Sequence, residues 1–291
     1  MGKRRRLTMR VAALAVLVAA LVAGAAACGS SAEPAVQRDQ LIVATTTSLN
    51  DSGLLEDAIL PALKERQPEL TVKVVAVGSG EAIAMGAKGE ADVLLVHSPA
   101  DEAQFMADGH GTLRLPFAYN HFIIVGPADD PAKVKQAKTA VEAFASIAQS
   151  SSVFVSRGDE SGTHKKELKL WDAAGVTPKG DWYVSTGQGM GETLRIAAEK
   201  QGYTLTDAGT YLSQKASLDL VALTSESEDL KNVYDAIIVN QNEFPAVNAA
   251  AAEQLCSLLV GAEGQKMIGD YGVKQYGQAL FRPFANSLGS Y

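Results

Sequence analysis

Short runs of apolar residues alternate with longer amphipathic segments along most of the chain. A run of about five consecutive apolar residues is typical of a strand covered on both faces, whereas apolar positions three and four residues apart predict a helix. The pattern predicts strands at residues 40–45, 71–77, 92–97, 122–125, 153–156, 181–184 and 236–240. It predicts helices at residues 52–66, 81–88, 100–108, 141–149, 162–174, 192–201, 206–215, 228–234, 246–259 and 263–271, with Pro61 kinking or splitting the first of them.

This alternation of strands and helices predicts an α/β fold with mostly parallel sheets. The 264 residues that follow the first 27 are enough for one or two domains with a large core. The sequence contains no internal repeat and no linker between two obvious domains. Two lobes joined by strands that cross between them would produce such a sequence.

The first 27 residues have the composition of an export signal. Five basic residues lie between Lys3 and Arg10, and 17 uncharged apolar or small residues follow them up to Ala27. This layout is typical of a secretory signal peptide, and the uncharged run is shorter than the ~20 strongly apolar residues that a spanning helix needs. We expect residues 1–27 to be the signal, with a retained anchor as the alternative and both Sec and twin-arginine export open. Residues 28–40 are expected to be a flexible tether.

Cys28 stands where a bacterial lipoprotein carries its lipid. Ala25-Ala26-Ala27-Cys28 is similar to a lipobox, with Ala25 in the place of the usual large aliphatic residue, and the three alanines also fit simple cleavage. A lipid on Cys28 would tether the protein to the outer face of the cell membrane, whereas simple cleavage would leave it in the periplasm. The second cysteine, Cys256, lies in an amphipathic helical run and is expected to be a buried apolar residue rather than half of a disulfide.

The charge of the chain argues against nucleic-acid binding. The chain has 26 basic and 33 acidic residues, and five of the basic ones lie in the first 27 residues, which contain no acidic one. The rest of the chain therefore carries 21 basic and 33 acidic residues, a net charge of −12. A phosphate backbone needs a basic face, which this balance does not supply.

Three predicted strands end in loops of Gly, Ser and Thr that open a helix. They are residues 43–53 (VATTTSLNDSG), 77–81 (VGSGE) and 155–163 (VSRGDESGT). The first N–H groups of a helix have no partner within it and the helix dipole makes this end partly positive, so it suits an anion. In α/β sheets such loops gather at the carboxyl ends of the strands. Each loop alone could be an ordinary cap or turn, but together with the planar cation of Arg157, which Asp159 could orient, they predict a site for a compact dianion.

Other chemistry has less support in the sequence. The glycine-rich turn at residues 186–191 could line the same cleft, but it lacks the spacing of a nucleotide-binding loop. The spacing of the four histidines, residues 97, 110, 121 and 164, fits no compact zinc site, and the HExxH and GxSxG motifs are absent. An exported serine hydrolase built from Ser161, His164 and Asp159 is kept as a hypothesis of another class.

Five segments, taken in order, resemble the tungstate-binding proteins of ABC importers. They are residues 45–55 (TTTSLNDSGLL), 89–97 (GEADVLLVH), 154–167 (FVSRGDESGTHKKE), 187–191 (GQGMG) and 203–207 (YTLTD). The resemblance extends from about Leu41 to the C-terminus. The chain departs from the family at Glu81, where an uncharged residue is more usual, and at Ser98, where an acid or amide often follows the histidine.

The resemblance implies a two-lobed periplasmic-binding-protein fold of type II with a mostly parallel sheet in each lobe. Lobe 1 would comprise residues 41–120 and 238–291 and lobe 2 residues 121–237, with crossing strands near 119–125 and 236–240. The oxyanion would be bound by Thr46, Thr47, Ser48 and Ser79 of lobe 1 and by Arg157, Ser161, Gly162 and Thr163 of lobe 2. The resemblance further implies a monomer without catalytic residues, metal or cofactor, which delivers tungstate or molybdate to the permease subunits of an ABC importer.

Phosphate is the alternative ligand, because the segment RGDESGT is also similar to the anion loop of phosphate-binding proteins. Hydrogen phosphate carries a proton and needs an acceptor in its site, whereas tungstate, molybdate and sulfate carry none at neutral pH. An acidic oxygen of Asp159 or Glu81 facing the ligand would therefore favour phosphate. A sensor domain that shares the fold without serving transport is the third hypothesis.

Overall fold

A computed structural model describes residues 39–285 of the chain. In this part, a mixed sheet of eight strands and a sheet of two strands carry helices on their faces, so the predicted α/β class is confirmed. The larger sheet has the order β10-β4-β9-β3-β1-β2, and β7 and β8 also pair with β4. The strands are β1 Gln40–Thr46, β2 Thr71–Val77, β3 Val93–Val96, β4 Gly111–Gly126, β5 Phe154–Ser156, β6 Tyr183–Ser185, β7 Thr204–Asp207, β8 Val221–Ala222, β9 Lys231–Val239 and β10 Arg282–Pro283.

The directions of the strands correct the expectation of mostly parallel sheets. The pairs β1–β2, β1–β3 and β5–β6 are parallel. In contrast, β9 runs antiparallel to β3 and β4, and β7, β8 and β10 run antiparallel to β4. The reason is the length of β4, which pairs with β9 along residues 111–121 and with β7 along residues 122–125. A chain that leaves one part of the molecule on β4 and returns on β9 must run in opposite directions on the two strands.

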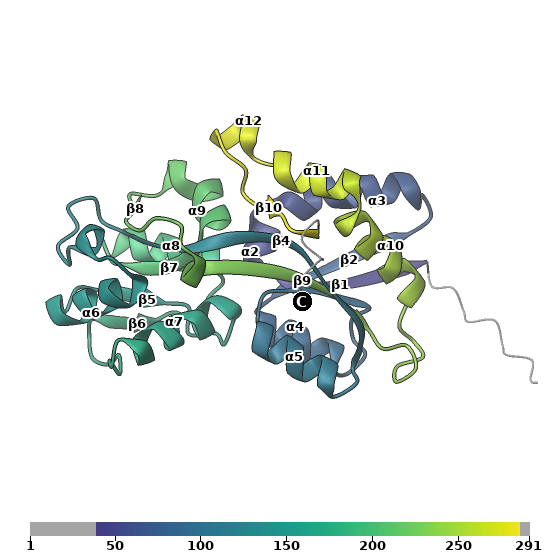
Figure 1. The fold of residues 1–291 in the computed structure, drawn as a ribbon, viewed down its shortest axis with the longest axis horizontal. Helices are drawn as coiled ribbons and strands as arrows, with labels where there is room; N and C mark the ends of the chain where they lie inside the picture. Colours follow the sequence, from purple (N-terminus) through teal and green to yellow (C-terminus); the bar gives the residue numbers. More distant parts are fainter. Residues whose placement is uncertain (1–38, 286–291) are drawn as a thin grey trace, which may run out of the picture. The chain divides into compact units, whose positions relative to one another are not determined.

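Two groups of apolar clusters form separate cores along these long strands. The clusters of group 1 draw on residues 41–118 and 234–281, and those of group 2 on residues 122–230. Figure 1 shows β4 and β9 passing from one group to the other. The helices of group 1 are α2 Thr47–Asp51, α3 Leu60–Arg66, α4 Ser79–Gly86, α5 Pro99–Ala107, α10 Ala249–Val260, α11 Ala262–Asp270 and α12 Val273–Tyr276, and those of group 2 are α6 Ala140–Ser150, α7 Gly162–Ala173, α8 Met190–Glu199 and α9 Ala208–Gln214. The exact limits of lobes 1 and 2 stay a prediction.

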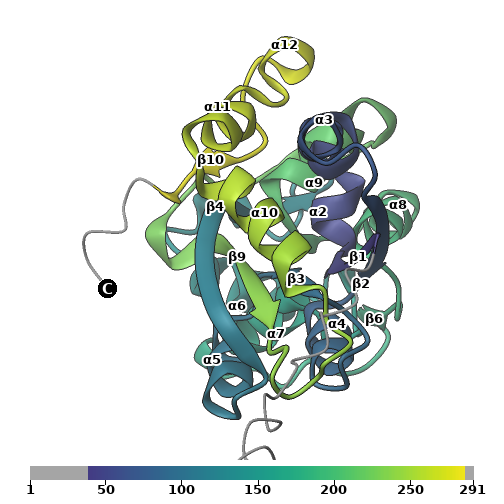
Figure 2. The ribbon, with the colours of Figure 1, turned by 90° about the vertical axis from the view of Figure 1, so that its right-hand side faces the viewer.

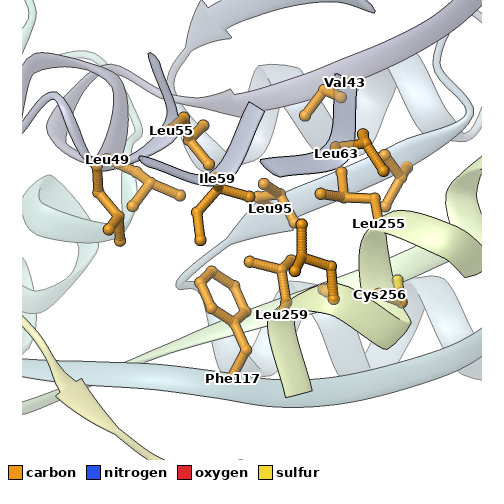
Figure 3. Close-up of a cluster of buried hydrophobic side chains, with 14 of the residues drawn as sticks. Val43, Leu49, Leu55, Ile59, Leu63, Leu95, Phe117, Leu255, Cys256 and Leu259 are labelled. Carbon is orange, nitrogen blue, oxygen red and sulfur yellow. The ribbon is translucent and has the colours of Figure 1, made fainter. Parts of the chain in front are cut away.

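Helices cover both faces of the sheet in group 1. Figures 1 and 2 show α3, α10 and α11 on one face and α4 and α5 on the other. Figure 3 shows the apolar side chains on the face covered by α3, α10 and α11, where Leu255, Cys256 and Leu259 of α10 pack toward Leu63, Leu95 and Phe117. Cys256 is 2% exposed, so its predicted role as a buried apolar residue is confirmed, and burial raises the pKa of its thiol to about 12.

The helix predicted at residues 52–66 is divided, as Pro61 led us to expect. A π-helical turn at Leu55–Ile59 precedes α3, and Pro61 lies in the first turn of α3. Because proline has no N–H to donate, it is tolerated there but interrupts a continuous helix. The division leaves Leu55, Ile59 and Leu63 facing the same core.

Two other predicted helices are wrong in whole or in part. The helix predicted at residues 228–234 is a single 3-10 turn, Glu228–Leu230, followed by β9. The pairing of β9 with β4 overrides the local helical pattern of residues 231–234. The helix predicted at residues 206–215 begins only at Ala208, because Thr204–Asp207 form β7 against β4.

The predicted export signal, the lipidation site Cys28 and all of the predicted tether except Asp39 and Gln40 lie outside the described residues. Gln40 already begins β1. Within residues 39–285, no helix has the length and apolar character needed to cross a membrane.

Candidate functional site

The three loops singled out in the sequence come together in the structure. Thr46 ends β1, and its Oγ1 accepts a hydrogen bond from the N–H of Leu49 at 3.3 Å, so it caps α2. Ser79 begins α4 after β2, and Ser161 caps α7 by accepting from the N–H of His164 at 3.3 Å. A methyl group on Gly78 would lie 3.5 Å from the Cα of Ser161. The helix starts of α4 and α7, from groups 1 and 2, therefore face each other at close range.

Arg157 links the two groups at this place. Its side chain is 1% exposed, and its Nη2 donates to Oγ1 of Thr47 at 3.1 Å and to Oδ2 of Asp159 at 2.5 Å. Its Nε and Nη1 are buried and have no hydrogen-bond partner, and the same is true of Oγ1 of Thr163. Because a buried donor without a partner costs about 1–3 kcal/mol, these groups are suited to a bound acceptor.

The carboxylate that pairs with Arg157 has both of its oxygens hydrogen-bonded within the protein. Oδ2 of Asp159 accepts from Arg157, and its Oδ1 accepts from the main-chain N–H of Ser161 at 3.2 Å. Asp159 thus orients the guanidinium, as its place in the sequence indicated. Glu81, in the first turn of α4, is exposed.

The hydroxyl of Ser48 is engaged within the protein. Its Oγ lies 3.1 Å from Oγ1 of Thr46, 3.3 Å from Nε2 of His97 and 3.5 Å from the hydroxyl of Tyr234. Burial, together with the positive charge of Arg157, lowers the pKa of His97 to about 4, so this imidazole is neutral at neutral pH. A neutral imidazole leaves Arg157 as the cation at this place. Ser48 thus connects α2 to β9, one of the two strands that cross between the groups.

Ser79 and Gly162 both lie in close contact with His97. Oγ of Ser79 is fully buried and accepts from the main-chain N–H of His97 at 3.5 Å. A methyl group on Gly162 would lie 2.6 Å from the carbonyl oxygen of His97. The structure therefore brings together the loops that carry all eight predicted site residues. The hydroxyl of Ser48, however, already contacts other side chains of the protein.

Comparison with known proteins places this arrangement in a family. The family model of the PBP superfamily domain matches residues 29–254, which is more than half of the chain. The chain belongs to the PBP superfamily. This superfamily member is 47% identical over 277 residues to the tungstate-binding protein TupA of Peptoclostridium acidaminophilum, a match that covers 93% of this chain and 96% of that protein.

Two solved structures are similar to this PBP superfamily member. The tungstate ABC transporter protein from Geobacter sulfurreducens is 47% identical with a TM-score of 0.73, covering 80% of this chain and 98% of that chain. The tungstate-binding protein TupA from Desulfovibrio alaskensis G20 is 44% identical with a TM-score of 0.69, covering 84% and 99% of the two chains. The resemblance to tungstate-binding proteins of ABC importers, read from the sequence segments, is thereby confirmed.

The structure of this PBP superfamily member also contains polar residues that the sequence reasoning missed. Nδ1 of His97 lies 2.9 Å from Oδ1 of Asn232, and Nδ2 of Asn232 donates to Oδ1 of Asn120 at 2.9 Å. Nδ2 of Asn120 donates to the buried Asp207 at 3.0 Å, and burial raises the pKa of that carboxyl. Asn120 and Asn232 are partners across β4 and β9. An asparagine in each of two apolar strands is the sequence signal that could have identified this network.

The hydrolase hypothesis finds no matching geometry in this superfamily member. Oγ of Ser161 caps α7, Nδ1 of His164 accepts from the N–H of Glu160 at 3.0 Å, and both oxygens of Asp159 are occupied as described. The three groups are thus used separately rather than as a nucleophile, a base and an orienting acid. Among residues 39–285, no three His, Cys, Asp or Glu side chains form a group that could hold a metal ion.

Proposed function

We propose that the protein is an extracytoplasmic solute-binding protein that captures tungstate, or molybdate, for an ABC importer. The observation that carries the proposal is the set of buried donors without partners, Nε and Nη1 of Arg157 and Oγ1 of Thr163. A tetrahedral dianion supplies acceptor oxygens and a charge opposite to that of the guanidinium. The relatives above are named as tungstate-binding proteins or tungstate transporter components, which supports binding rather than catalysis.

The donor set favours a fully deprotonated anion over hydrogen phosphate. Hydrogen phosphate would need an acceptor for its proton, and both carboxylate oxygens of Asp159 already accept hydrogen bonds from the protein. Glu81 is exposed rather than buried against Arg157. Phosphate therefore remains the weaker alternative, and the sensor hypothesis differs from transport in the partner rather than in the ligand.

The proposed ligand groups are Thr46, Thr47, Ser48 and Ser79 from group 1 and Arg157, Ser161, Gly162 and Thr163 from group 2. Hydrogen bonds to a charged ligand contribute roughly 1.5–3 kcal/mol each, so about six of them suffice for nanomolar binding, which needs about 12 kcal/mol. Because donors come from both groups, all of them can reach the anion only when the groups are close together. The anion thus favours the closed state, and a permease can recognise that state.

We further propose that the protein acts as an exported monomer without a cofactor. Residues 1–27 would be the export signal, and lipid on Cys28 would hold the mature protein at the outer face of the cell membrane beside the permease subunits. The similarity of Ala25-Ala26-Ala27-Cys28 to a lipobox supports this anchor. Simple cleavage and release into the periplasm is the alternative.

Replacing Arg157 tests the proposed site. We expect Arg157→Ala to lower the affinity for sodium tungstate at least tenfold, roughly 1.4 kcal/mol, in titration calorimetry, because the planar cation is lost. Arg157→Lys keeps a charge but lacks the planar fork and should also bind more weakly. Circular dichroism would verify that both variants fold. The matched control is Arg195→Ala, which removes an exposed arginine paired with Glu192 on α8.

Unchanged tungstate affinity in both Arg157 variants would contradict the assigned site. In the same calorimeter, a titration of wild-type protein with tungstate in the presence of millimolar sodium phosphate compares the two anions. We expect no measurable competition from phosphate. Strong competition would favour the phosphate-binding alternative.

A further inference from the structure

A groove beside the Arg157 site is lined by residues from both groups. Its volume is about 390 Å³, and its walls come from the start of α5, from α7 and from the start of β9, with Phe122 of β4 also contributing. Figure 1 shows α5 and α7 on the same side of β9.

Four lysines line this groove. Lys165, Lys166 and Lys169 lie on α7, and Lys231 begins β9. Asp101 of α5 forms an ion pair with Lys165, whereas Nζ of Lys166 donates to the main-chain oxygen of Asp229. Among the described residues that line the groove, Asp101 is the one carboxylate, so the lining carries an excess of positive charge.

The charges of these lysines are close enough to affect one another. Partial burial, opposed by Asp229 and reinforced by the positive charge of Lys169, lowers the pKa of Lys166. Lys231 lies 4.7 Å from the ring centroid of Tyr119 and 3.7 Å from the highly exposed carboxylate of Glu228. The positive field of the groove is therefore only partly neutralised from within.

The groove reaches the edge of the anion site. Gly162, a proposed ligand residue, and His97, which it contacts, both belong to the lining. Nζ of Lys165 lies 3.9 Å from the position of a methyl group on Gly80, in the first turn of α4. The Gly162 end of the groove therefore lies beside the starts of α4 and α7, which carry Ser79 and Ser161.

The rest of the molecule would repel the ligand. Without its first 27 residues the chain has a net charge of −12, and a dianion approaching such a surface is slowed at low salt. We propose that the lysine groove is an electrostatic guide that draws the oxyanion toward the Arg157 site and raises its association rate. The proposal rests on the proposed function, because the anion that it guides is the one bound at Arg157.

The double variant Lys166→Gln/Lys169→Gln tests this guide. It removes two charges from the groove and leaves the Lys165–Asp101 ion pair and Lys231 in place. We expect the association rate constant for sodium tungstate to fall about threefold to tenfold at ~20 mM ionic strength, with the dissociation rate unchanged. At ~0.5 M salt the difference should shrink below about twofold, because the Debye length is then only a few ångström. Kinetic titration calorimetry measures both rates without needing a chromophore.

The matched control is Lys138→Gln/Lys200→Gln, which makes the same change in net charge at two exposed lysines outside the groove lining. Equal association rates for the two double variants would overturn the guide, and so would a faster dissociation with unchanged association. If wild-type protein bound tungstate in two events and the groove variant lost one of them, the groove would be a second binding site rather than a guide. Failure of wild-type protein to bind tungstate would count against the proposed function itself.

Discussion

Gly162 illustrates how a missing side chain shapes the site. It begins α7, and a methyl group there would lie 2.6 Å from the carbonyl oxygen and 2.9 Å from Nδ1 of His97. His97 cannot easily withdraw, because its ring is held by Ser48 and Asn232. The absence of a side chain at Gly162 thus lets Thr163 and Arg157 come close to group 1.

Adding a methyl group at this position should weaken ligand binding. Overpacking a close contact costs about 1–3 kcal/mol, and we expect Gly162→Ala to raise the dissociation constant for tungstate about tenfold or more. Gly80→Ala is the control, since its methyl group would lie 3.4 Å from the nearest atom, the carbonyl oxygen of Glu160. Titration calorimetry measures both. Equal affinities of the two variants would mean that the contact with His97 does not limit the approach of the groups.

At the scale of elements, a buried carboxylate ties α7 to the neighbouring strands. Glu167 of α7 accepts from Oγ of Ser156 at 2.7 Å, from the hydroxyl of Tyr183 at 2.8 Å and from Nε1 of Trp171 at 3.0 Å. Ser156 in turn accepts from the N–H of Gly158, in the loop that carries Arg157. Burial, opposed by these three donors and reinforced by Asp159, raises the pKa of Glu167 to about 7.

This raised pKa predicts a distinctive pH dependence of stability. The folded protein keeps the proton on Glu167 up to about pH 7, whereas the unfolded chain releases it near its ordinary value of 4.5. Glu167 therefore lowers the free energy of unfolding as the pH rises from 4.5 to 7, by about 3 kcal/mol in total. Urea unfolding across this range should show that Glu167→Gln removes this part of the slope. The exposed Glu199→Gln should keep the wild-type slope, and an unchanged slope in Glu167→Gln would refute the assignment.

Sequence patterns predict elements well where local and long-range preferences agree. The strand expected at residues 71–77 and the start of the helix at Gly162 match the structure, because apolar runs and capping residues mark them. The pattern fails for β7 and for the first part of β9, residues 231–234, whose pairing with β4 is a long-range property. The network of Asn120 and Asn232 was missed for the same reason, since its members are 112 residues apart in the chain.

At the scale of the whole molecule, the proposed anion site draws on two groups that have cores of their own. Arg157 follows β5 of group 2 and donates to Thr47 of group 1. The chain has two tryptophans, Trp171 and Trp182, and both pack in one core cluster of group 2. Tryptophan fluorescence therefore reports the unfolding of group 2, whereas far-ultraviolet circular dichroism reports the unfolding of helices in both groups.

Tungstate should stabilise both groups together. A ligand at 1,000 times its dissociation constant adds about 4 kcal/mol to the free energy of unfolding. Because the proposed donors come from both groups, neither group can unfold without losing that contribution, and we expect the fluorescence and dichroism melting transitions to rise by the same amount. Arg157→Ala should lose most of this rise at the same tungstate concentration. An upward shift of the fluorescence transition alone would mean that group 2 holds the anion without group 1, because a ligand stabilises only the part of the molecule whose folding its binding requires.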